Sequence, residues 1–327
     1  MASGNKLRSL PFEFENLVNL VELDLTENTF TKLPSQIADM GVLETLKMAD
    51  NNLDITSARA LVPTLLAKLD FARNNLSVVP DDIGQITTLK ELVLANNELS
   101  EFPSCVLPLK GLERLVLSNN DILALPGAIS KLKSLRELAL ARCGLTEIPD
   151  TVGNLRHLRS LVLRNNALEF LPGTIGFLAK LRRLDLEGNN LTSLPRQISG
   201  MGALEELILK RNSLASLPEE IGALTSLVVL DLAENQIDAL PPSVHACAEL
   251  ATLELDQNPL NPKFEKVYNK GIPALLKHLA KVFARSGARY PSATRSALAS
   301  TSSSASASSS AQSSTSRRVS FAQDSDE

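Results

Sequence analysis

Cysteine and histidine are the side chains from which metal sites and catalytic nucleophiles are most often built, and this 327-residue chain contains three of each. They are Cys105, Cys143, Cys247, His157, His245 and His278. No two of the cysteines have the C-x-x-C spacing of a metal or redox site. The sequence also contains no glycine-rich phosphate-binding loop, no H-E-x-x-H motif and no G-x-S-x-G motif. We therefore expect no catalytic residue, no metal and no cofactor.

A short segment near the end of the chain, residues 317–321 with the sequence Arg-Arg-Val-Ser-Phe, fits two recognition patterns. Arg318, Val319 and Phe321 match the R/K-V-x-F pattern through which regulators dock on protein phosphatase-1, where two apolar side chains fill pockets and the segment extends a sheet edge. The same segment reads as R-R-x-S, a pattern favoured by kinases such as protein kinase A, with Ser320 as the acceptor. Phosphate on Ser320 adds about −1.5 to −2 charge between the two apolar anchors, so docking and phosphorylation should exclude each other.

One pattern, L-x-x-L-x-L-x-x-N-x-L, organises most of the chain and returns every 23 residues. Its asparagine position is filled by Asn5, Asn28, Asn51, Asn74, Asn97, Asn120, Cys143, Asn166, Asn189, Asn212, Asn235 and Asn258. A fixed period of about 20–29 residues with this pattern is typical of a solenoid, in which each unit forms one turn of a coil. Buried asparagines should form a ladder of hydrogen bonds to adjacent turns. Cys143 can fill the position with weaker hydrogen bonds, so replacing it with asparagine should leave the protein at least as stable.

Each unit should begin with a short strand and return through a tight turn. In the unit that starts at residue 181, Leu184 and Leu186 alternate with Arg183 and Asp185, which places the leucines inside the coil. Successive strands then pair in parallel on the concave side. A Leu-Pro step after the asparagine starts a short 3₁₀ or helical turn on the convex side, because proline fixes φ. The third unit has residues 54–60 in place of this step, and there we expect a more regular helix.

The predicted fold class is an α/β solenoid, a horseshoe with a parallel concave sheet and short 3₁₀ or helical turns on the convex side. Residues 1–258 should hold a partial first unit, without the polar cap usual for a terminal repeat, followed by eleven 23-residue units. Within residues 259–285, the apolar spacing from Ile272 to Leu279 predicts an amphipathic capping helix. Residues 286–327 are rich in serine and poor in apolar side chains, so we expect a disordered tail.

The outward-facing strand positions indicate where a partner could bind. One column of these positions turns apolar in the middle of the array, at Val93, Val116, Ala139 and Val162, and again at Ile208. The basic residues beside it are Arg142, Arg164, Lys210 and Arg211. An apolar stripe with a basic edge is typical of a docking site for a protein with an acidic rim. The alternative is that β-propensity alone placed valines on these strands.

Composition narrows the class of function and the compartment. A net charge of −4 and a pI near 5.6 argue against a general nucleic-acid or membrane-surface binder. No apolar run is long enough to span a membrane, and the first residues lack a signal-peptide pattern. Three scattered cysteines without a cysteine-rich cap favour a reducing, cytoplasmic setting.

Over residues 1 to about 285 the chain resembles the leucine-rich-repeat superfamily. The 23-residue L-P-x-x-I-G-x-L-x-x-L version, together with Asn258-Pro259-Leu260, Gly271-Ile272 and Leu275-Leu276 near its end, is similar to the intracellular Ras-group (Shoc/Sur-like) scaffolds and their plant relatives. The resemblance implies a non-enzymatic scaffold in intracellular signal transduction, with a Ras-like small GTPase on the concave face and a phosphatase elsewhere. The alternative function is a targeting or substrate-recognition subunit of a phosphatase or ubiquitin-ligase complex.

Overall fold

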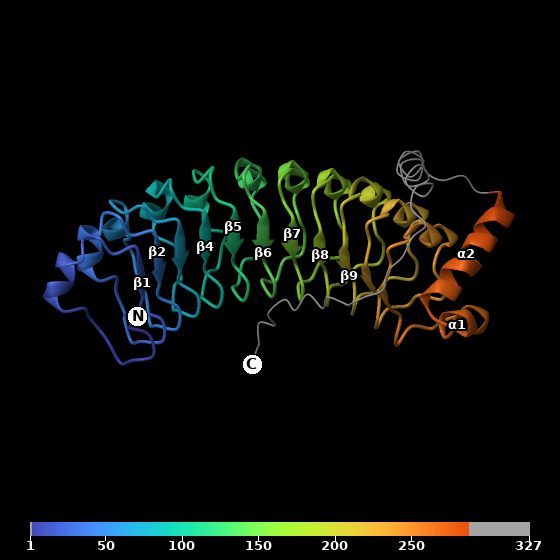
Figure 1. The fold of residues 1–327 in the computed structure, drawn as a ribbon, viewed down its shortest axis with the longest axis horizontal. Coiled ribbons are helices and arrows are strands. Elements are labelled where there is room, and N and C mark those ends of the chain that lie inside the picture. The colour runs from blue at the N-terminus through green and yellow to red at the C-terminus, as the bar shows by residue number, and fades with distance from the viewer. Residues whose placement is uncertain (1, 288–327) are drawn as a thin grey trace, which may run out of the picture.

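In the computed structural model, residues 2–287 are described, and they form one curved coil of parallel strands (Figure 1). Eleven strands pair in sequence order, each with the next, in a single parallel sheet. The strands are β1 (Glu22–Asp24), β2 (Thr45–Lys47), β3 (Lys68–Asp70), β4 (Glu91–Val93), β5 (Arg114–Val116), β6 (Glu137–Ala139), β7 (Ser160–Val162), β8 (Arg183–Asp185), β9 (Glu206–Ile208), β10 (Val229–Asp231) and β11 (Thr252–Glu254). The solenoid predicted from the repeat is confirmed.

Neighbouring strands pair without a shift of register. Asp24 of β1 lies opposite Lys47 of β2, and Val93 of β4 lies opposite Val116 of β5. Because side chains alternate between the two faces of a strand, this register collects equivalent residues of all units into columns. The middle residue of each strand is a leucine that points into the coil, where it is buried in every unit.

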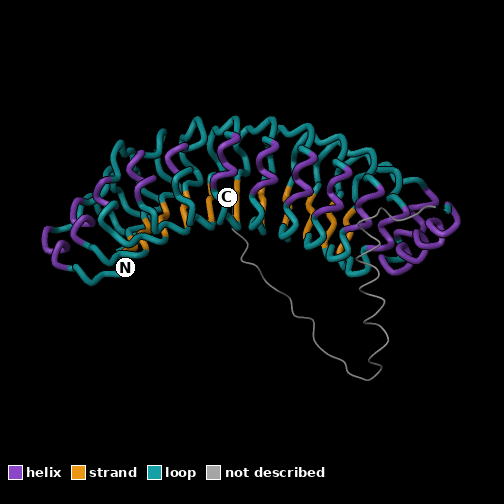
Figure 2. The backbone as a smooth tube through the Cα atoms, turned by 90° about the horizontal axis from the view of Figure 1, so that it is seen from above, coloured by secondary structure: helices purple, strands orange, loops and turns teal. Residues whose placement is uncertain are grey.

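Short 3₁₀ helices form the opposite, convex side of the coil, as Figure 2 shows. They are η1 (Phe12–Asn16), η2 (Ser35–Asp39), η3 (Arg59–Leu61), η4 (Asp81–Gln85), η5 (Ser104–Val106), η6 (Gly127–Lys131), η7 (Asp150–Asn154), η8 (Gly173–Phe177), η9 (Arg196–Gly200), η10 (Glu219–Ala223) and η11 (Pro242–Ala246). Each of them except η3 follows directly on a proline whose φ lies between −57° and −71°. The proline therefore sets the angle at which the chain leaves the core.

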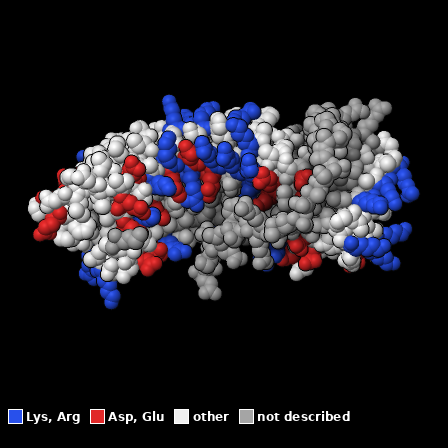
Figure 3. All heavy atoms as spheres, in the orientation of Figure 1, with Lys and Arg blue, Asp and Glu red and all other residues white. Residues whose placement is uncertain are grey.

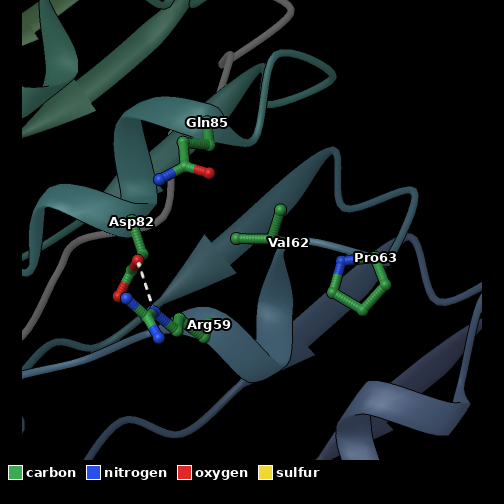
Figure 4. Close-up of a pocket in the computed structure, with 5 residues that line it drawn as sticks. All are labelled: Arg59, Val62, Pro63, Asp82 and Gln85. Carbon is green, nitrogen blue, oxygen red and sulfur yellow. Dashed lines mark ion pairs between the residues drawn. The ribbon is translucent and has the colours of Figure 1, made fainter.

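The third unit lacks this proline, and the regular helix expected there is wrong, because η3 spans only three residues. Instead, the carboxylate of Asp82 in the following unit accepts hydrogen bonds from the Ser57 hydroxyl at 2.8 Å and from the Ala58 N–H at 2.9 Å. The Arg59 guanidinium lies 3.7 Å from the same carboxylate (Figure 4). The bond from the Ala58 N–H, followed by that from Ser57, lowers the pKa of Asp82. A side chain of the next turn thus holds the segment in place of the proline.

Buried asparagines join successive turns of the coil, as predicted. Asn189 is representative: its Nδ2 donates to the carbonyl oxygens of Leu163 at 3.0 Å and Leu186 at 2.9 Å. Its Oδ1 accepts the N–H of Leu168 in the preceding turn at 3.1 Å. The amide oxygen gives a buried backbone N–H its acceptor, and the two carbonyl oxygens also accept from Asn166 and Asn212 of the adjacent units, so the bonds form a continuous ladder.

The first asparagine of the repeat, Asn5, is not part of the ladder, which begins at Asn28. The ladder is interrupted once, at Cys143. Asn5 is exposed, and within residues 2–287 its side-chain amide donates only to the carbonyl oxygens of Ala2 and Ser3. Cys143 places its Sγ 3.3 Å from the carbonyl oxygen of Leu117 but offers no counterpart of the amide oxygen. The N–H that would bond to such an oxygen belongs to Ile122, which is fully buried and has no hydrogen-bond acceptor among residues 2–287.

The two ends of the coil are covered in different ways. At the first end, the N–H groups of residues 2, 4 and 5 each donate at 3.0 Å to carbonyl oxygens of the segment 24–27, which begins at the last residue of β1. At the other end, the α-helices α1 (Pro262–Tyr268) and α2 (Ile272–Ser286) pack on the last unit. Leu275, Leu279 and Phe283 of α2 are buried there, as the apolar spacing predicts. Most of the predicted tail, from residue 288 onward, lies outside the described residues.

The three cysteines are free thiols without a reactive environment. Burial raises the pKa of Cys105 and of Cys143 to about 11 and that of Cys247 to about 12. Because the thiolate is the reactive form, we expect the folded chain to resist alkylation by iodoacetamide at neutral pH, and all three residues to react once it is denatured. Mass spectrometry of the alkylated chain measures this, and rapid labelling of folded Cys143 would contradict it.

The same shifts predict a loss of stability in alkali. In the unfolded chain these thiols ionise near their ordinary pKa of 9.0, whereas in the folded chain they stay neutral up to about pH 11. Their contribution to the free energy of unfolding is therefore fully present below pH 9 and is lost as the pH rises through the folded values.

Candidate protein-binding face

The concave sheet brings the predicted apolar residues into one column. Val93, Val116, Ala139 and Val162 lie opposite one another on β4 to β7. Val116 is only 9% exposed and Ala139 only 8%. Val93 and Val162 are half-buried, and so is Ile208, which Asp185 separates from the others. The column is therefore a shallow apolar stripe, most accessible at its two ends.

The aspartates in the same column shape the turn that follows each strand. Asp24, Asp70, Asp185 and Asp231 each accept, through Oδ1, the N–H of the residue two positions on, at 2.9–3.2 Å. Asp185 is only 2% exposed. Burial raises the pKa of Asp70, and the hydrogen bond from the backbone partly offsets this effect. These carboxylates have an internal role, which accounts for them without a binding partner.

Where valine replaces aspartate, the turn has no such acceptor. The residues two positions after Val93 and Val116 are Ala95 and Ser118, and both are half-buried on this face. In the described part of the chain, the N–H group of neither residue has a hydrogen-bond acceptor. The middle of the concave face therefore presents backbone donors next to apolar side chains, which is a combination that a partner's carbonyl or carboxylate oxygens can use.

A second column runs beside the apolar stripe, two residues earlier on each strand, and it is charged on seven of the eleven strands. The Arg114 guanidinium lies 2.6 Å from the Glu91 carboxylate and 3.0 Å from that of Glu137. Arg183 likewise lies 3.1 Å from Glu206. Figure 3 shows acidic and basic side chains next to one another over the middle of this face. This column was not among the predicted site residues, although the repeat register places its members opposite one another.

The predicted basic edge is divided into two parts. Arg142 and Arg164 lie in adjacent turns, with the N–H of Arg142 donating to the carbonyl oxygen of Arg164 at 2.9 Å. Lys210 and Arg211 lie further along, and both contact Glu234, at 3.4 Å and 3.0 Å. The hydrogen bond from Arg211 lowers the pKa of Glu234, and Glu234 raises the pKa of Arg211. Glu234 was absent from the predicted site and neutralises part of its basic edge.

Arg318, Val319, Ser320 and Phe321 lie outside the described residues. Among residues 2–287, no group of three or more His, Cys, Asp or Glu side chains could hold a metal ion. None of the helices described is long and apolar enough to cross a membrane.

Comparison with known proteins identifies similar chains. Two family profiles match: "Leucine-rich repeat region" at residues 129–212, and "Leucine rich repeat" at residues 64–122, 87–145 and 202–260. Among solved structures, a leucine-rich-repeat protein from Leptospira interrogans is 37% identical, with a TM-score of 0.79, and the match covers 83% of this chain and 69% of that one. None of the curated proteins matches significantly in sequence.

Two plant receptors are also similar. The ectodomain of the membrane receptor kinase GASSHO1/SCHENGEN3 from Arabidopsis thaliana, in complex with CASPARIAN STRIP INTEGRITY FACTOR 2, is 30% identical with a TM-score of 0.56. The plant peptide hormone receptor RGFR1, in complex with RGF2, is 26% identical with a TM-score of 0.54. The matches cover 79% and 78% of this chain, but only 34% and 50% of the receptors.

Proposed function

Because this chain belongs to the leucine-rich-repeat family, whose fold generally mediates protein–protein interaction, we propose that its concave face binds a protein partner and that the chain is a non-enzymatic scaffold in intracellular signal transduction. The observation that carries the proposal is the middle of the concave sheet. There, the apolar column from Val93 to Val162 lies beside the charged column through Arg114 and beside the N–H groups of Ala95 and Ser118, which have no acceptor among residues 2–287. Apolar contact area bordered by fixed charges is the usual composition of a protein interface.

A Ras-like small GTPase is the partner that we propose for this face. The support is the resemblance of the repeated L-P-x-x-I-G-x-L-x-x-L pattern of this chain to the Ras-group scaffolds. Arg142 and Arg164 at the edge of the stripe suit a partner with an acidic rim. The three free thiols agree with the reducing cytoplasmic location that we propose.

The tail provides the second part of the proposal. Arg318, Val319 and Phe321 would dock on protein phosphatase-1, and phosphorylation of Ser320 would release it. The same motif favours the alternative function, in which the chain is the targeting or substrate-recognition subunit of a phosphatase complex. As such a subunit of a ubiquitin-ligase complex, the chain would bind the substrate on its concave face. The two functions differ in whether the bound partner is a substrate of the recruited enzyme.

The test of the concave site is the double variant Val116→Asp and Val162→Asp. We expect it to fold, because four other units carry aspartate in this column, where its Oδ1 accepts a backbone N–H. Two carboxylates in the apolar stripe should weaken capture of purified Ras-like GTPases at least about tenfold. Thr45→Asp and Thr252→Asp add the same charges to β2 and β11, away from the stripe, and should leave capture intact.

Unchanged capture by the valine variant, with its folding confirmed by circular dichroism, would exclude this face. In the same experiment, a chain that ends at Ser316 separates the two parts of the proposal. It should lose protein phosphatase-1 while it keeps the concave partner, and retention of the phosphatase would contradict docking through the tail.

A further inference from the structure

Basic side chains gather on one edge of the coil, in the loops that lead from the 3₁₀ helices to the strands of four consecutive units. Residues 107–113, 130–136, 153–159 and 176–182 contain eight lysines and arginines and one glutamate. The eight residues, here called the basic rim, are Lys110, Lys131, Lys133, Arg136, Arg156, Arg159, Lys180 and Arg182. All of them are exposed. Figure 3 shows Lys and Arg gathered along this edge, over the middle of the array.

The same loops elsewhere in the coil have the opposite character. In the seven other units, residues 15–21, 38–44, 61–67, 84–90, 199–205, 222–228 and 245–251 contain one lysine and five acidic residues. Because the repeat frame is the same in every unit, the fold itself does not require basic residues at these positions. The basic rim is a local feature of an otherwise acidic chain, with a net charge of −4.

Three arginines of the rim lie directly side by side. The N–H of Arg159 donates to the carbonyl oxygen of Arg136 at 2.7 Å, and the N–H of Arg182 donates to that of Arg159 at 2.8 Å. Like charges in such adjacent positions repel one another. Glu113 pairs with Arg136 at 3.3 Å, and Glu205 pairs with Arg182 at 2.8 Å. Among the described residues, the middle arginine, Arg159, has no acidic partner. The positive charge of the cluster is therefore neutralised at Arg136 and Arg182 but not at Arg159.

Apolar contact sites lie at both ends of the rim. At one end, Leu107 and Pro108 line a shallow hollow together with Lys110, Lys131 and Lys133. At the other end, Phe177 is 51% exposed, and the guanidinium of Arg156 lies 5.1 Å from the centre of its ring. The rim thus combines a row of cations with separated sites for apolar side chains.

We propose that the basic rim binds an extended acidic polypeptide segment of a partner protein, in which carboxylates alternate with single apolar residues. Adjacent turns of the coil are about 4.8 Å apart, and an extended peptide rises about 3.3 Å per residue, so acidic residues every one or two positions can meet successive units. Single-stranded nucleic acid needs aromatic side chains on which bases stack. In these four loops only Phe177 and His157 carry aromatic rings. Arg156 already lies over the ring of Phe177, and the Nδ1 atom of His157 lies 3.1 Å from the carbonyl oxygen of Lys133. This surface is separate from the concave face and does not depend on the proposed function.

The test uses the full chain and a fluorescent peptide in which pairs of glutamates alternate with leucine. The rim variant is Lys133→Gln, Arg159→Gln and Lys180→Gln, three exposed residues without an acidic partner in the described part of the chain. We expect saturable binding by the natural chain, measured by fluorescence anisotropy, and a loss of about tenfold in the variant, since each exposed ion pair contributes modestly.

The matched control is Lys277→Gln, Lys281→Gln and Arg285→Gln, which removes the same charge from the exposed side of α2. It should bind the peptide as the natural chain does. Equal weakening by both variants would show a nonspecific attraction and overturn the proposal, as would equal binding of a peptide with glutamine in place of glutamate. Tighter binding of oligothymidine or of phosphatidylserine vesicles through the same three residues would overturn the assignment to a polypeptide.

Discussion

Replacement of Gly176 by alanine should lower the free energy of unfolding by about 2–3 kcal/mol, because the added methyl group has no space. A Cβ atom at Gly176 would lie 2.1 Å from the carbonyl oxygen of Gln197 in the next turn. The added Cβ atom would be fixed to the backbone, and the carbonyl oxygen that it meets is also a backbone atom. Rotation of a side chain therefore cannot relieve the contact. Two turns of the convex side must move apart instead. Since a solenoid unit contacts only its neighbours, this shift weakens the coil at its middle.

Denaturation in urea, followed by circular dichroism, measures the loss at Gly176. Gly202 provides the control, because it lies in the loop before β9 and a Cβ atom there would have no neighbour within 4 Å. Gly202→Ala should leave the midpoint unchanged or raise it slightly, since alanine restricts the unfolded chain. The same midpoint for both variants would mean that the convex backbone adapts to the methyl group.

Asn189→Cys should cost about 2–3 kcal/mol, because it creates a second break in the asparagine ladder. The amide of Asn189 serves the N–H of Leu168 and the carbonyl oxygens of Leu163 and Leu186, all of which lie in or beside the core. A thiol can replace at most a weak donor and leaves the N–H of Leu168 buried without an acceptor.

Cys143→Asn is the reciprocal change and should stabilise the chain by about 1 kcal/mol or more, since it supplies an amide oxygen to the buried N–H of Ile122. The thermal midpoint of the two variants and the natural chain measures both effects in one experiment. A fall in the midpoint on Cys143→Asn would show that the core around this position has adapted to the smaller thiol.

The sequence predicts most of the fold because the repeat leaves few choices. Asparagine at every 23rd residue indicates the ladder, and the Leu-Pro step indicates where each 3₁₀ helix starts. The error at residues 54–60 has a definite cause. The group that holds this segment, the carboxylate of Asp82, lies 25 residues from Ser57, in the following unit. No local pattern in residues 54–60 shows that such a contact exists.

The concave site was only partly open to prediction. The register gave the column from Val93 to Val162 correctly, because columns follow directly from the period. The sequence could not show that Val116 and Ala139 are almost covered, nor that the aspartates of the column bond to their own turns. The exposure and the hydrogen bonds of a side chain depend on how the side chains of neighbouring units pack against it. The repeat period does not determine this packing.

By itself, then, the sequence of this protein determined the coil, the buried asparagine ladder and the assignment of residues to columns, because a strict period permits one way to stack the units. Tertiary structure alone decided which charges pair across adjacent turns. In the folded coil, Arg114 pairs with both Glu91 and Glu137. Arg159 lies between Arg136 and Arg182, which have acidic partners, but has none itself in the described chain. The physical reason is that ion pairs form over distances of a few ångströms between long, flexible side chains, whose positions depend on the packing around them.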